Sequence, residues 1–395
     1  MKNVVLGVTG SIAAFKAAEI ASALVKLGAG VDVIMTKNAC EFISPLTFET
    51  LTGRPVTCDM FRRDTPWEVE HIALAKKADV FVVAPATANF IGKYANGIAD
   101  DMLTTTAMAA NAHMIIAPAM NTNMFRSAAN LENIKKLGAA GVEFVSPSSG
   151  RLACGDVGMG RLADISDIVS AILRALEPKK DLLGKRVLIT AGPTRETIDP
   201  IRFISNRSSG KMGYALASTA YNRGAEVTLV SGPTALKPPY GVEFVRAEST
   251  EEMYKACMDR LESMDIIIKA AAPADFTPKA PAGHKLKKAG ISTLALELAP
   301  TPDILRAIGA NKGKAFVCGF AAETDELEAY AREKLERKNL DMIAANDVSR
   351  SDAGFESNNN AVTMFFRNGE KKVVPLCSKA DVAEQILDAI ASRLG

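Results

Sequence analysis

The chain has 395 residues, of which 48% are hydrophobic and 23% are charged. This length exceeds what a single hydrophobic core usually needs and predicts two or three domains. Because 47 lysines and arginines nearly balance 45 acidic residues, the net charge of +2 excludes the strong field that would predict nucleic-acid or membrane binding.

The cysteines and the N-terminus indicate the compartment. The six cysteines are scattered without a CxxC pair, and MKNVVLGVTG enters a strand-like run directly instead of a signal peptide. No apolar run approaches the length of a membrane span. We therefore expect a cytoplasmic protein without a structural zinc site or a membrane segment.

The first half alternates strand-like and helix-like segments. The apolar run NVVLGV is followed by the turn TGS and by a segment in which Ile20, Leu24 and Leu27 recur at helical spacing. Further strand-like runs are VDVIMT, DVFVVAPAT, HMIIAPAM and VEFVSP. This order predicts a doubly wound parallel sheet that binds its ligand at the carboxyl ends of the strands.

A polar hinge, EPKKDLLG at residues 177–184, precedes a second set of strands. The pattern restarts with KRVLITAGPT, a helix from about Ser209 and AEVTLVSG, and it continues in MDIIIKAAAPAD, AFVCGFAAET and LDMIAANDV. AVTMFFRNGEKKVVPL predicts a hairpin with an Asn-Gly turn. The predicted fold class is α/β with two doubly wound parallel-sheet domains, residues 1–178 (flavodoxin-like) and 182–395 (Rossmann-like).

Gly10 and Ser11 form a turn before the first predicted helix. Free backbone N–H groups and the positive end of the helix dipole at such a turn suit a phosphate monoester. The glycine could equally serve only to make a tight turn, because GVTGS lacks the GxGxxG spacing. Both interpretations stay open at this point.

Four strings in the first half, GVTGSIAAFK, APATANFIGKYANGIADDMLTT, APAMN and ACGDVGMGRL, resemble the flavin-containing cysteine decarboxylase family. The resemblance covers nearly all of residues 1–175 and implies a flavodoxin-like domain that binds FMN. Phe90 stands where the family has a threonine, so no contact is carried over there. The implied FMN-binding residues are Gly10, Ser11, Ile12, Thr36, Lys37, Asn38, Thr87, Ala88, Asn89 and Ala119.

Three residues of the first half are implied to be catalytic. A lone histidine is more often a partly buried structural residue, and a free cysteine is most often a small apolar one. The resemblance instead implies that His71 is catalytic, that Asn121 holds the substrate carboxylate and that Cys154 donates a proton from a glycine-flanked flap. FMN would oxidise the substrate thiol, which creates the electron sink that decarboxylation needs, and would later return the electrons.

The second half carries the string TAGPTRETIDPIRFISNRSSGKMG between a strand and a helix, where an open sheet places phosphates. Met212 follows its Gly-Lys, so the string is not a Walker A loop. Together with AAPADF, KLKK, TPDIL, VCGFAAET, AREKLERKNLD and AANDV, it resembles phosphopantothenoylcysteine synthetase, the ligase fused to this decarboxylase in many prokaryotes, over residues 185–390. Bacterial members use CTP to activate the substrate carboxylate as an acyl-cytidylate.

The ligase resemblance also implies site residues. Asn206 would lie beside the acyl-cytidylate, or it could cap the following helix. Lys285 would serve the second half-reaction, although a charged loop is usually only solvated. Lys334 and Lys338 are four residues apart on a predicted helix, where like charges repel unless a triphosphate binds. The implied nucleotide-binding residues are Asp275, Lys285, Pro302, Asp303, Ile304, Leu305, Phe320, Lys334 and Lys338.

Asp275, at the predicted end of the strand IIIKAAAPAD, is the candidate ligand for Mg2+. The residues alone do not decide between CTP and ATP. The predicted function is thus two steps of coenzyme A biosynthesis: ligation of 4'-phosphopantothenate with cysteine, then decarboxylation to 4'-phosphopantetheine. The expected cofactors are FMN and Mg2+, and CTP is the expected co-substrate.

The expected partners are small molecules, not nucleic acid or membrane, and the trimers and dimers of the two families imply a homo-dodecamer. Two other functions are compatible with parts of the sequence. A flavin oxidoreductase with a non-catalytic tail leaves the ligase motifs unexplained. A regulatory phosphatase subunit usually lacks a catalytic residue or has an acidic tail, whereas His71, Asn121 and Cys154 are all present here.

Overall fold

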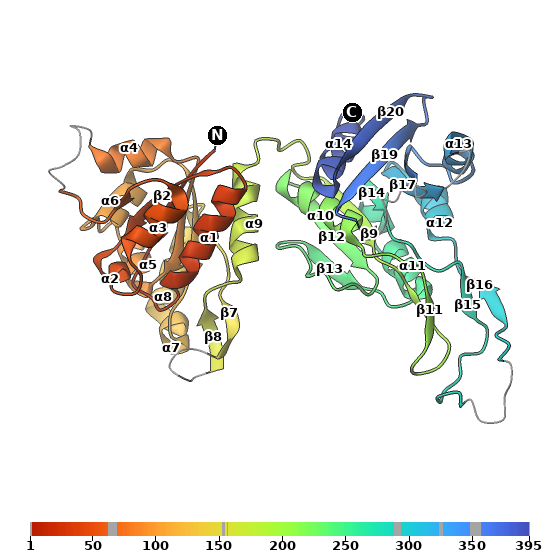
Figure 1. Ribbon diagram of the computed structural model, residues 1–395, viewed down its shortest axis with the longest axis horizontal. Helices are drawn as coiled ribbons and strands as arrows, with labels where there is room; N and C mark the ends of the chain where they lie inside the picture. Colours follow the sequence, from red (N-terminus) through yellow and green to blue (C-terminus); the bar gives the residue numbers. More distant parts are fainter. Residues whose placement is uncertain are drawn as a thin grey trace. The chain divides into compact units, whose positions relative to one another are not determined.

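The structure is a computed structural model of the 395-residue chain (Figure 1). It describes residues 2–61, 69–151, 155, 157–287, 294–323, 327–347 and 357–394. The chain divides into two compact units, Met1–Pro178 and Lys179–Gly395, and each unit is described by itself. Within these ranges, no helix is long and apolar enough to span a membrane.

The N-terminal unit contains a six-stranded parallel sheet in the order β3-β2-β1-β4-β5-β6. Strands β1, β2 and β4 are buried along almost their whole length, which explains their continuous apolar sequences. The strand order reverses between β1 and β4, so the ligand-binding switch point of a doubly wound sheet lies there. The strands are β1 (Asn3–Val8), β2 (Gly30–Met35), β3 (Val56–Thr57), β4 (Val80–Ala86), β5 (His113–Pro118) and β6 (Glu143–Phe144).

Helices cover both faces of this sheet. On one face, α4 (Glu70–Lys77), α5 (Ala88–Ala95), α6 (Met102–Ala109) and α8 (Ala128–Ala139) pack over a core that includes Phe81 and Ile116. On the other face, α1 (Ala14–Lys26) contacts α3 (Pro45–Thr52) and α9 (Ile165–Leu176). Two short helices, α2 (Lys37–Cys40) and α7 (Thr122–Arg126), and the hairpin β7 (Ser148–Arg151) and β8 (Val157–Arg161) complete the described unit.

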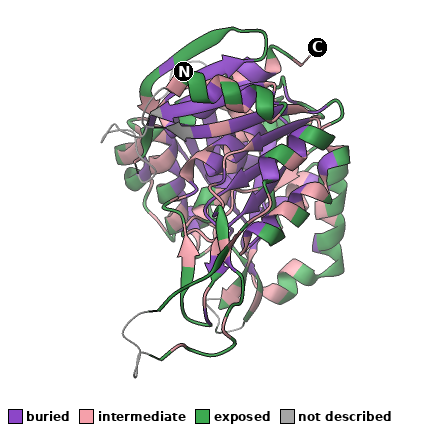
Figure 2. Cartoon of the chain, turned by 90° about the vertical axis from the view of Figure 1, so that its right-hand side faces the viewer, coloured by how far each residue is buried: buried purple, intermediate pink, exposed green. Residues whose placement is uncertain are grey.

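The C-terminal unit contains an eight-stranded sheet in the order β13-β12-β9-β14-β17-β18-β19-β20. Its strands are parallel as far as β18, and β19 and β20 pair antiparallel at the edge. Figure 2 shows buried strands between helices whose outer turns are exposed. The strands are β9 (Arg186–Ala191), β12 (Glu226–Ser231), β13 (Glu243–Arg246), β14 (Ile266–Lys269), β17 (Phe316–Glu323), β18 (Met342–Asp347), β19 (Asn359–Phe366) and β20 (Lys371–Ser378).

Two apolar clusters fill the two sides of the second sheet. One includes α10 (Lys211–Asn222) and α14 (Lys379–Ala391). The other includes α11 (Thr250–Met258), α12 (Ile304–Asn311), α13 (Leu327–Arg337) and the short 3-10 helix η1 (Leu261–Ser263). Outside the sheet, two short antiparallel pairs are β10 (Arg195–Thr197) with β11 (Phe203–Ser205), and β15 (Phe276–Pro278) with β16 (Leu298–Pro300).

The predicted fold class, α/β with two doubly wound and mainly parallel sheets, is confirmed. The predicted hairpin is β19–β20, with Asn368 and Gly369 in its turn. Two strands are shorter than predicted, since β6 contains only two residues and β14 ends at Lys269. After β14, only a single bridge between Ala272 and Pro193 continues the pairing, because Pro273 offers no N–H to a ladder.

Arg223 is a fully buried cation at the end of α10. Its guanidinium donates to Asp181 Oδ1 at 2.9 Å and lies 2.9 Å from Asp388 Oδ1 and 3.3 Å from Glu384 Oε2. These carboxylates come from the predicted hinge and from α14. Arg223 therefore fastens the start of the C-terminal unit to two of its helices.

We expect Arg223→Ala to lower the free energy of unfolding of the C-terminal unit by about 2–4 kcal/mol. The substitution leaves three carboxylates without their shared cation, but each is about 40% exposed, so part of the loss is screened. Chemical denaturation of the full chain measures this, with the exposed Arg246→Ala as control. Equal midpoints for the two variants would contradict the expectation.

Candidate functional site

The turns that follow four neighbouring strands of the N-terminal sheet form the first candidate site. They are residues 9–12 after β1, 36–38 after β2, 87–89 after β4 and 119–121 after β5. Because the carboxyl ends of parallel strands meet at one edge, the fold brings these turns together. All ten residues predicted to bind FMN lie in them: Gly10, Ser11, Ile12, Thr36, Lys37, Asn38, Thr87, Ala88, Asn89 and Ala119.

Hydrogen bonds join the turns to one another. The buried Thr9 hydroxyl donates to Pro85 O at 2.8 Å and accepts from Thr87 N at 3.0 Å. Thr36 N donates to Val8 O at 3.0 Å, and Ala119 N donates to Ala86 O at 2.9 Å. The four turns are thus fixed to the strands around the switch point.

Gly10 is required where two of these turns touch. A Cβ atom at Gly10 would lie 2.4 Å from Asn38 Cβ and 3.1 Å from its carbonyl carbon. Close packing against Asn38 therefore explains this glycine, and both the phosphate-binding and the tight-turn interpretations stay predictions. The same close approach brings the first turn and the 36–38 turn to one place. Phe90 is buried and stacks on Tyr94, with ring centroids 5.8 Å apart, so its ring faces the core.

The predicted catalytic residues of this unit are only partly described. His71 lies in the first turn of α4 and is partly buried. Its neighbour Glu70 accepts from the Thr57 hydroxyl at 2.7 Å, which places this turn at the end of β3. Cys154 lies outside the described residues, between the strands β7 and β8.

Asn121 is the N-cap of α7, and its Oδ1 accepts from Asn123 N at 2.8 Å. The hairpin β7–β8 packs directly on this turn, since Met120 N donates to Gly160 O at 2.9 Å. A Cβ atom at Gly160 would lie 2.3 Å from Met120 O. The hairpin that contains the predicted flap therefore contacts the segment of Asn121.

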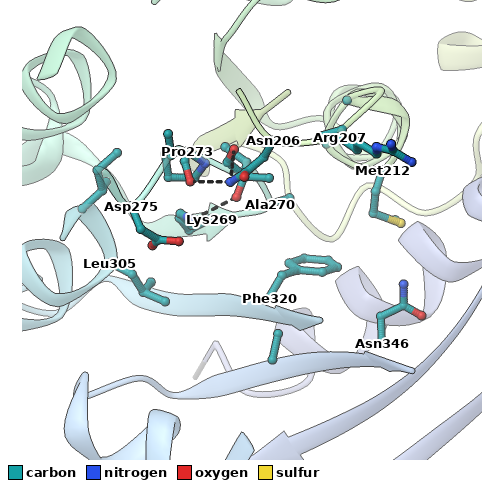
Figure 3. Close-up of a pocket in the computed structure, with 18 of the residues that line it drawn as sticks. Asn206, Arg207, Met212, Lys269, Ala270, Pro273, Asp275, Leu305, Phe320 and Asn346 are labelled. Atoms are coloured by element: carbon teal, nitrogen blue, oxygen red, sulfur yellow. Dashed lines mark hydrogen bonds between the residues drawn. The ribbon is translucent and has the colours of Figure 1, made fainter. Parts of the chain in front are cut away.

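The C-terminal unit contains a cavity of about 690 Å3, which is a usual size for a small-molecule site (Figure 3). Its walls come from the loop before α10, the loop after β14, the N-termini of α12 and α14, and parts of β17, β18 and α13. Nine predicted ligase residues line it: Asn206, Asp275, Pro302, Asp303, Ile304, Leu305, Phe320, Lys334 and Lys338. Lys285 is not among the lining residues.

Positive charge dominates the cavity. Six basic side chains line it against two carboxylates, those of Asp275 and Asp303; the six are Arg207, Lys211, Lys269, Lys334, Lys338 and Lys379. The N-terminus of α10 opens onto the same space, with Gly210 as its left-handed N-cap. Both features favour an anion with several charges, such as a nucleoside triphosphate.

Lys269 and Lys379 titrate far from the ordinary range of lysine. Desolvation, together with the nearby charges of Lys334 and Lys338, lowers the pKa of Lys269 to about 7. Desolvation, with the charge of Lys211, lowers the pKa of Lys379 to about 8. The cavity thus holds cations whose charge an anionic ligand would stabilise.

Asp303 is the paired carboxylate of the cavity. Burial acts to raise its pKa, but hydrogen bonds from Arg306 N and from the Lys338 ammonium outweigh burial and lower the pKa. The Lys338 ammonium lies 3.0 Å from Asp303 Oδ2. Lys334 donates to Phe320 O at 3.1 Å. Lys334 lies on α13 as predicted, whereas Lys338 lies one residue beyond the end of this helix.

Asn206 directs its amide toward the loop after β14. Its Nδ2 donates to Pro273 O at 2.9 Å and is 3.4 Å from Ala272 O (Figure 3). The alternative role as a helix cap is wrong, because Gly210 is the N-cap of α10. The Phe320 ring lies in the middle of the cavity, between Leu305 and Asn346 (Figure 3).

The prediction that Asp275 ends a strand is wrong, since β14 ends at Lys269 and Asp275 lies in the loop before β15. Its carboxylate is exposed at the cavity wall. Mg2+ is usually held by one or two carboxylates together with substrate phosphates, so this single acid fits that ion. Among the described residues, no group of three or more His, Cys, Asp or Glu side chains could hold a metal by itself.

Lys285 is exposed on a segment that Asp199 anchors. Leu286 N donates to the buried Asp199 Oδ2 at 3.1 Å, and Arg202 Nη2 donates to Leu286 O at 2.6 Å. Hydrogen bonds from Ile201 N, from the Arg202 side chain and from Leu286 N hold the pKa of Asp199 well below its usual range despite its burial. The role of Lys285 stays a prediction.

Sequence reasoning missed several residues of this cavity, including Lys211, Lys269, Asn346 and Lys379. Lys269 carried a usable signal, because it is a lone charge at the end of the apolar run IIIK. Among the described residues, the buried Asn346 Oδ1 has no hydrogen-bond partner. Asn346 stands in the string AANDV, which the ligase resemblance covers without giving this residue a role. No local pattern distinguishes Lys379 from lysines on other helices.

Comparison with known proteins gives the family. Residues 1–177 match the Flavoprotein family, and residues 182–394 match the DNA/pantothenate metabolism flavoprotein C-terminal domain family. Over 394 residues, the chain is 50% identical to the coenzyme A biosynthesis bifunctional protein CoaBC of Bacillus subtilis, with 99% of this chain and 97% of that protein covered. The chain belongs to this family of bifunctional proteins.

Other CoaBC proteins are similar to all or part of this chain. The Escherichia coli K12 member is 42% identical over 395 residues, with 99% of this chain and 97% of that protein covered. A crystal structure of the C-terminal domain of a CoaBC protein is 47% identical, covers 55% of this chain and 98% of that domain, and has a TM-score of 0.48. As a CoaBC family member, the chain is a bifunctional enzyme with a flavoprotein domain in its N-terminal unit.

Proposed function

We propose that the chain makes 4'-phosphopantetheine in two steps of coenzyme A biosynthesis. Residues 182–395 ligate 4'-phosphopantothenate with cysteine at the expense of CTP, and residues 1–178 decarboxylate the product with FMN. Family membership supports both steps. The observation that carries the proposal is the lysine-rich cavity lined by nine of the predicted ligase residues.

In the ligase unit, the side chains of the cavity bind and orient the reactants. Lys269, Lys334 and Lys338 would bind the triphosphate, and Asp275 would hold the accompanying Mg2+. The Phe320 ring offers a surface on which the base stacks. Asn206 would orient the carboxylate that becomes the acyl-nucleotide, and Lys285 would act when the amine of cysteine displaces the nucleotide.

In the decarboxylase unit, the four turns at the carboxyl ends of β1, β2, β4 and β5 would hold FMN. FMN supplies the oxidation of the substrate thiol that allows its carboxylate to leave as carbon dioxide. Asn121 would hold that carboxylate, and His71 and Cys154 would complete the site. The contact between Met120 and Gly160 supports this grouping, since it joins the Asn121 turn to the hairpin of Cys154.

A cytoplasmic homo-oligomer, a dodecamer of trimeric flavin units and dimeric ligase units, is part of the proposal. Large apolar side chains are exposed in both units, as an associating surface requires. Ile12 lies in the first FMN turn and Phe15 follows it at the start of α1. Ile201, Phe203 and Phe276 lie on or beside the short strand pairs of the ligase unit.

Product analysis tests the proposed function. The purified full chain is incubated with 4'-phosphopantothenate, cysteine, Mg2+ and either CTP or ATP, and products are followed by mass. We expect 4'-phosphopantetheine with CTP. Absence of any phosphopantothenoylcysteine-derived product with both nucleotides would refute the ligase, and accumulation of phosphopantothenoylcysteine would refute the decarboxylase. Product with ATP alone would correct the nucleotide.

A further inference from the structure

The loop after β14 carries two groups that the proposed ligation uses. Pro273 O accepts the amide of Asn206 at 2.9 Å, and Asp275 follows two residues later (Figure 3). Ala274, between them, is buried with 4% of its surface exposed. A displacement of this one peptide segment would therefore move the Asn206 amide and the Asp275 carboxylate together.

Threonine hydroxyls from three separate segments hold the backbone of Ala274. Its N–H donates to Thr194 Oγ1 at 2.9 Å, and its carbonyl accepts from Thr301 Oγ1 at 2.6 Å. Thr250 Oγ1 lies 3.3 Å from the same carbonyl. Thr194 and Thr250 are fully buried. Two of the three threonines that hold Ala274 are thus side chains that solvent does not reach.

The network ends at a buried carboxylate. Glu196, on β10, is 5% exposed, and its Oε1 accepts from Thr250 N at 2.9 Å and from Thr250 Oγ1 at 2.8 Å. The hydroxyls of Thr194 and Thr250 are 2.8 Å apart. The three side chains therefore form one continuous chain of hydrogen bonds from Ala274 to the carboxylate.

A threonine hydroxyl has one proton to donate, and this sets the direction of the chain. Because a charged acceptor makes the stronger bond, Thr250 donates to Glu196 and accepts from Thr194. The Thr194 hydroxyl therefore donates its hydrogen bond to Thr250, and the Thr194 oxygen accepts from Ala274 N–H. The charge of Glu196 therefore decides which group donates in each hydrogen bond between the carboxylate and the loop. Consecutive hydrogen bonds of this kind strengthen one another where water is excluded.

We propose that Glu196, Thr194 and Thr250 are positioning residues of the ligase site. None of them lines the cavity, so they act through the backbone of residues 273–275 on Asn206 and Asp275. This inference rests on the proposed ligase function and deepens it. It assigns a role to the buried acid of the TRET segment.

The decisive comparison is Thr250→Val against Thr250→Ser in the full chain. Valine keeps the branched shape and removes the hydroxyl, whereas serine keeps the hydroxyl and removes a methyl group. We expect Thr250→Val to lower kcat/KM for pyrophosphate release from CTP about 10- to 100-fold and to raise the Mg2+ concentration needed for half the maximal rate. Thr250→Ser should retain activity close to that of the unchanged protein.

Two measurements separate positioning from general damage. Hydrogen exchange of the peptide covering residues 272–275 should be faster in Thr250→Val and unchanged in Thr250→Ser, and it needs no turnover. Decarboxylation of added phosphopantothenoylcysteine by the same variant should stay unchanged. Glu248→Gln, which replaces a carboxylate that is 38% exposed, is the matched control and should ligate normally.

Glu196→Gln provides a second variant, because the amide retains an acceptor but loses the charge, and a smaller loss in the same direction is expected. If Thr250→Val does not fold, Glu196→Gln decides the question. Unchanged ligation and unchanged exchange in both variants would overturn the proposal. A loss of ligation in Thr250→Ser with normal ligation in Thr250→Val would also overturn it. If the unchanged protein releases no pyrophosphate, the proposed ligase function fails, and the exchange experiment still tests the network.

Discussion

Gly10→Ala is expected to remove FMN from the N-terminal unit and to slow decarboxylation about 100-fold or more. The added Cβ atom would lie 2.4 Å from Asn38 Cβ, and the nearest other atoms belong to the Asn38 backbone, which cannot rotate away. The 9–12 and 36–38 turns must therefore separate. Because both turns carry predicted FMN contacts, a shift of an ångström misplaces the flavin.

Flavin absorbance of the purified variant and turnover of added phosphopantothenoylcysteine measure this effect. Gly138→Ala is the matched control, since Gly138 lies in α8 and its added Cβ would meet no described atom within 4 Å apart from those of its own helix backbone. That control should keep its flavin and its rate. A Gly10→Ala protein with a full complement of FMN and normal turnover would contradict the assignment of these turns.

Lys269→Met is expected to weaken binding of Mg2+–CTP about 10- to 100-fold at pH 6. At this pH the ammonium of Lys269 is charged, because its pKa is about 7. A charge-assisted contact with a phosphate is then lost in the variant, while methionine fills the space of the lysine stem. Calorimetric titration measures the dissociation constant directly, without turnover.

The pH dependence of binding follows from the same lysine. A bound polyphosphate raises the pKa of Lys269, so between pH 7 and pH 8 the ligand must bind together with a proton and the affinity falls about tenfold per pH unit. Above pH 8, Lys379 also loses its proton, so the comparison is made below that value. The variant should lose this slope and the associated uptake of about one proton. Lys314→Met, which removes an exposed lysine outside the cavity, should retain both. Identical slopes in the two variants would exclude Lys269 from the binding site.

In the ligand-free chain, the lowered pKa of Lys269 also affects stability. Between pH 7 and the ordinary lysine value of 10.5, the unfolded chain carries the proton and the folded chain does not. The contribution of Lys269 to the free energy of unfolding therefore rises with pH across this window and is least favourable below pH 7. This loss of stability below pH 7 is the free-energy cost of a desolvated cation that an anionic ligand could contact.

The fold was largely predictable because its strands are short, apolar and separated by helical segments. NVVLGV became β1 with the predicted bounds, and the Asn-Gly turn identified the hairpin of β19 and β20. β3 was missed because a strand of two residues, Val56 and Thr57, has no period to detect. The run IIIKAAAPAD looked like one long strand, but Pro273 cannot donate to a ladder.

The candidate sites were predictable only in part, and for a different reason. Residues in contiguous motifs, such as Asp303 to Leu305, were found because the motif itself is local. Lys379 was missed because it lies on α14, outside every matching string. Asn346 was missed although it stands in AANDV on β18, because an uncharged side chain in an apolar strand does not reveal which ligand it faces. The hydrogen bonds of Thr194 and Thr250 depend on folded distances that no sequence period expresses.

The cluster around Arg223 has a consequence for acid conditions. The hydrogen bond from Arg223 lowers the pKa of Asp181 below the ordinary 3.8, so this contact adds stability above that value and loses it as acid protonates the folded carboxylate. Asp181 belongs to the segment that joins the two units. Acidification should therefore break the contact between Asp181 and Arg223 at the start of the C-terminal unit before the apolar core of that unit unfolds, because apolar side chains do not titrate.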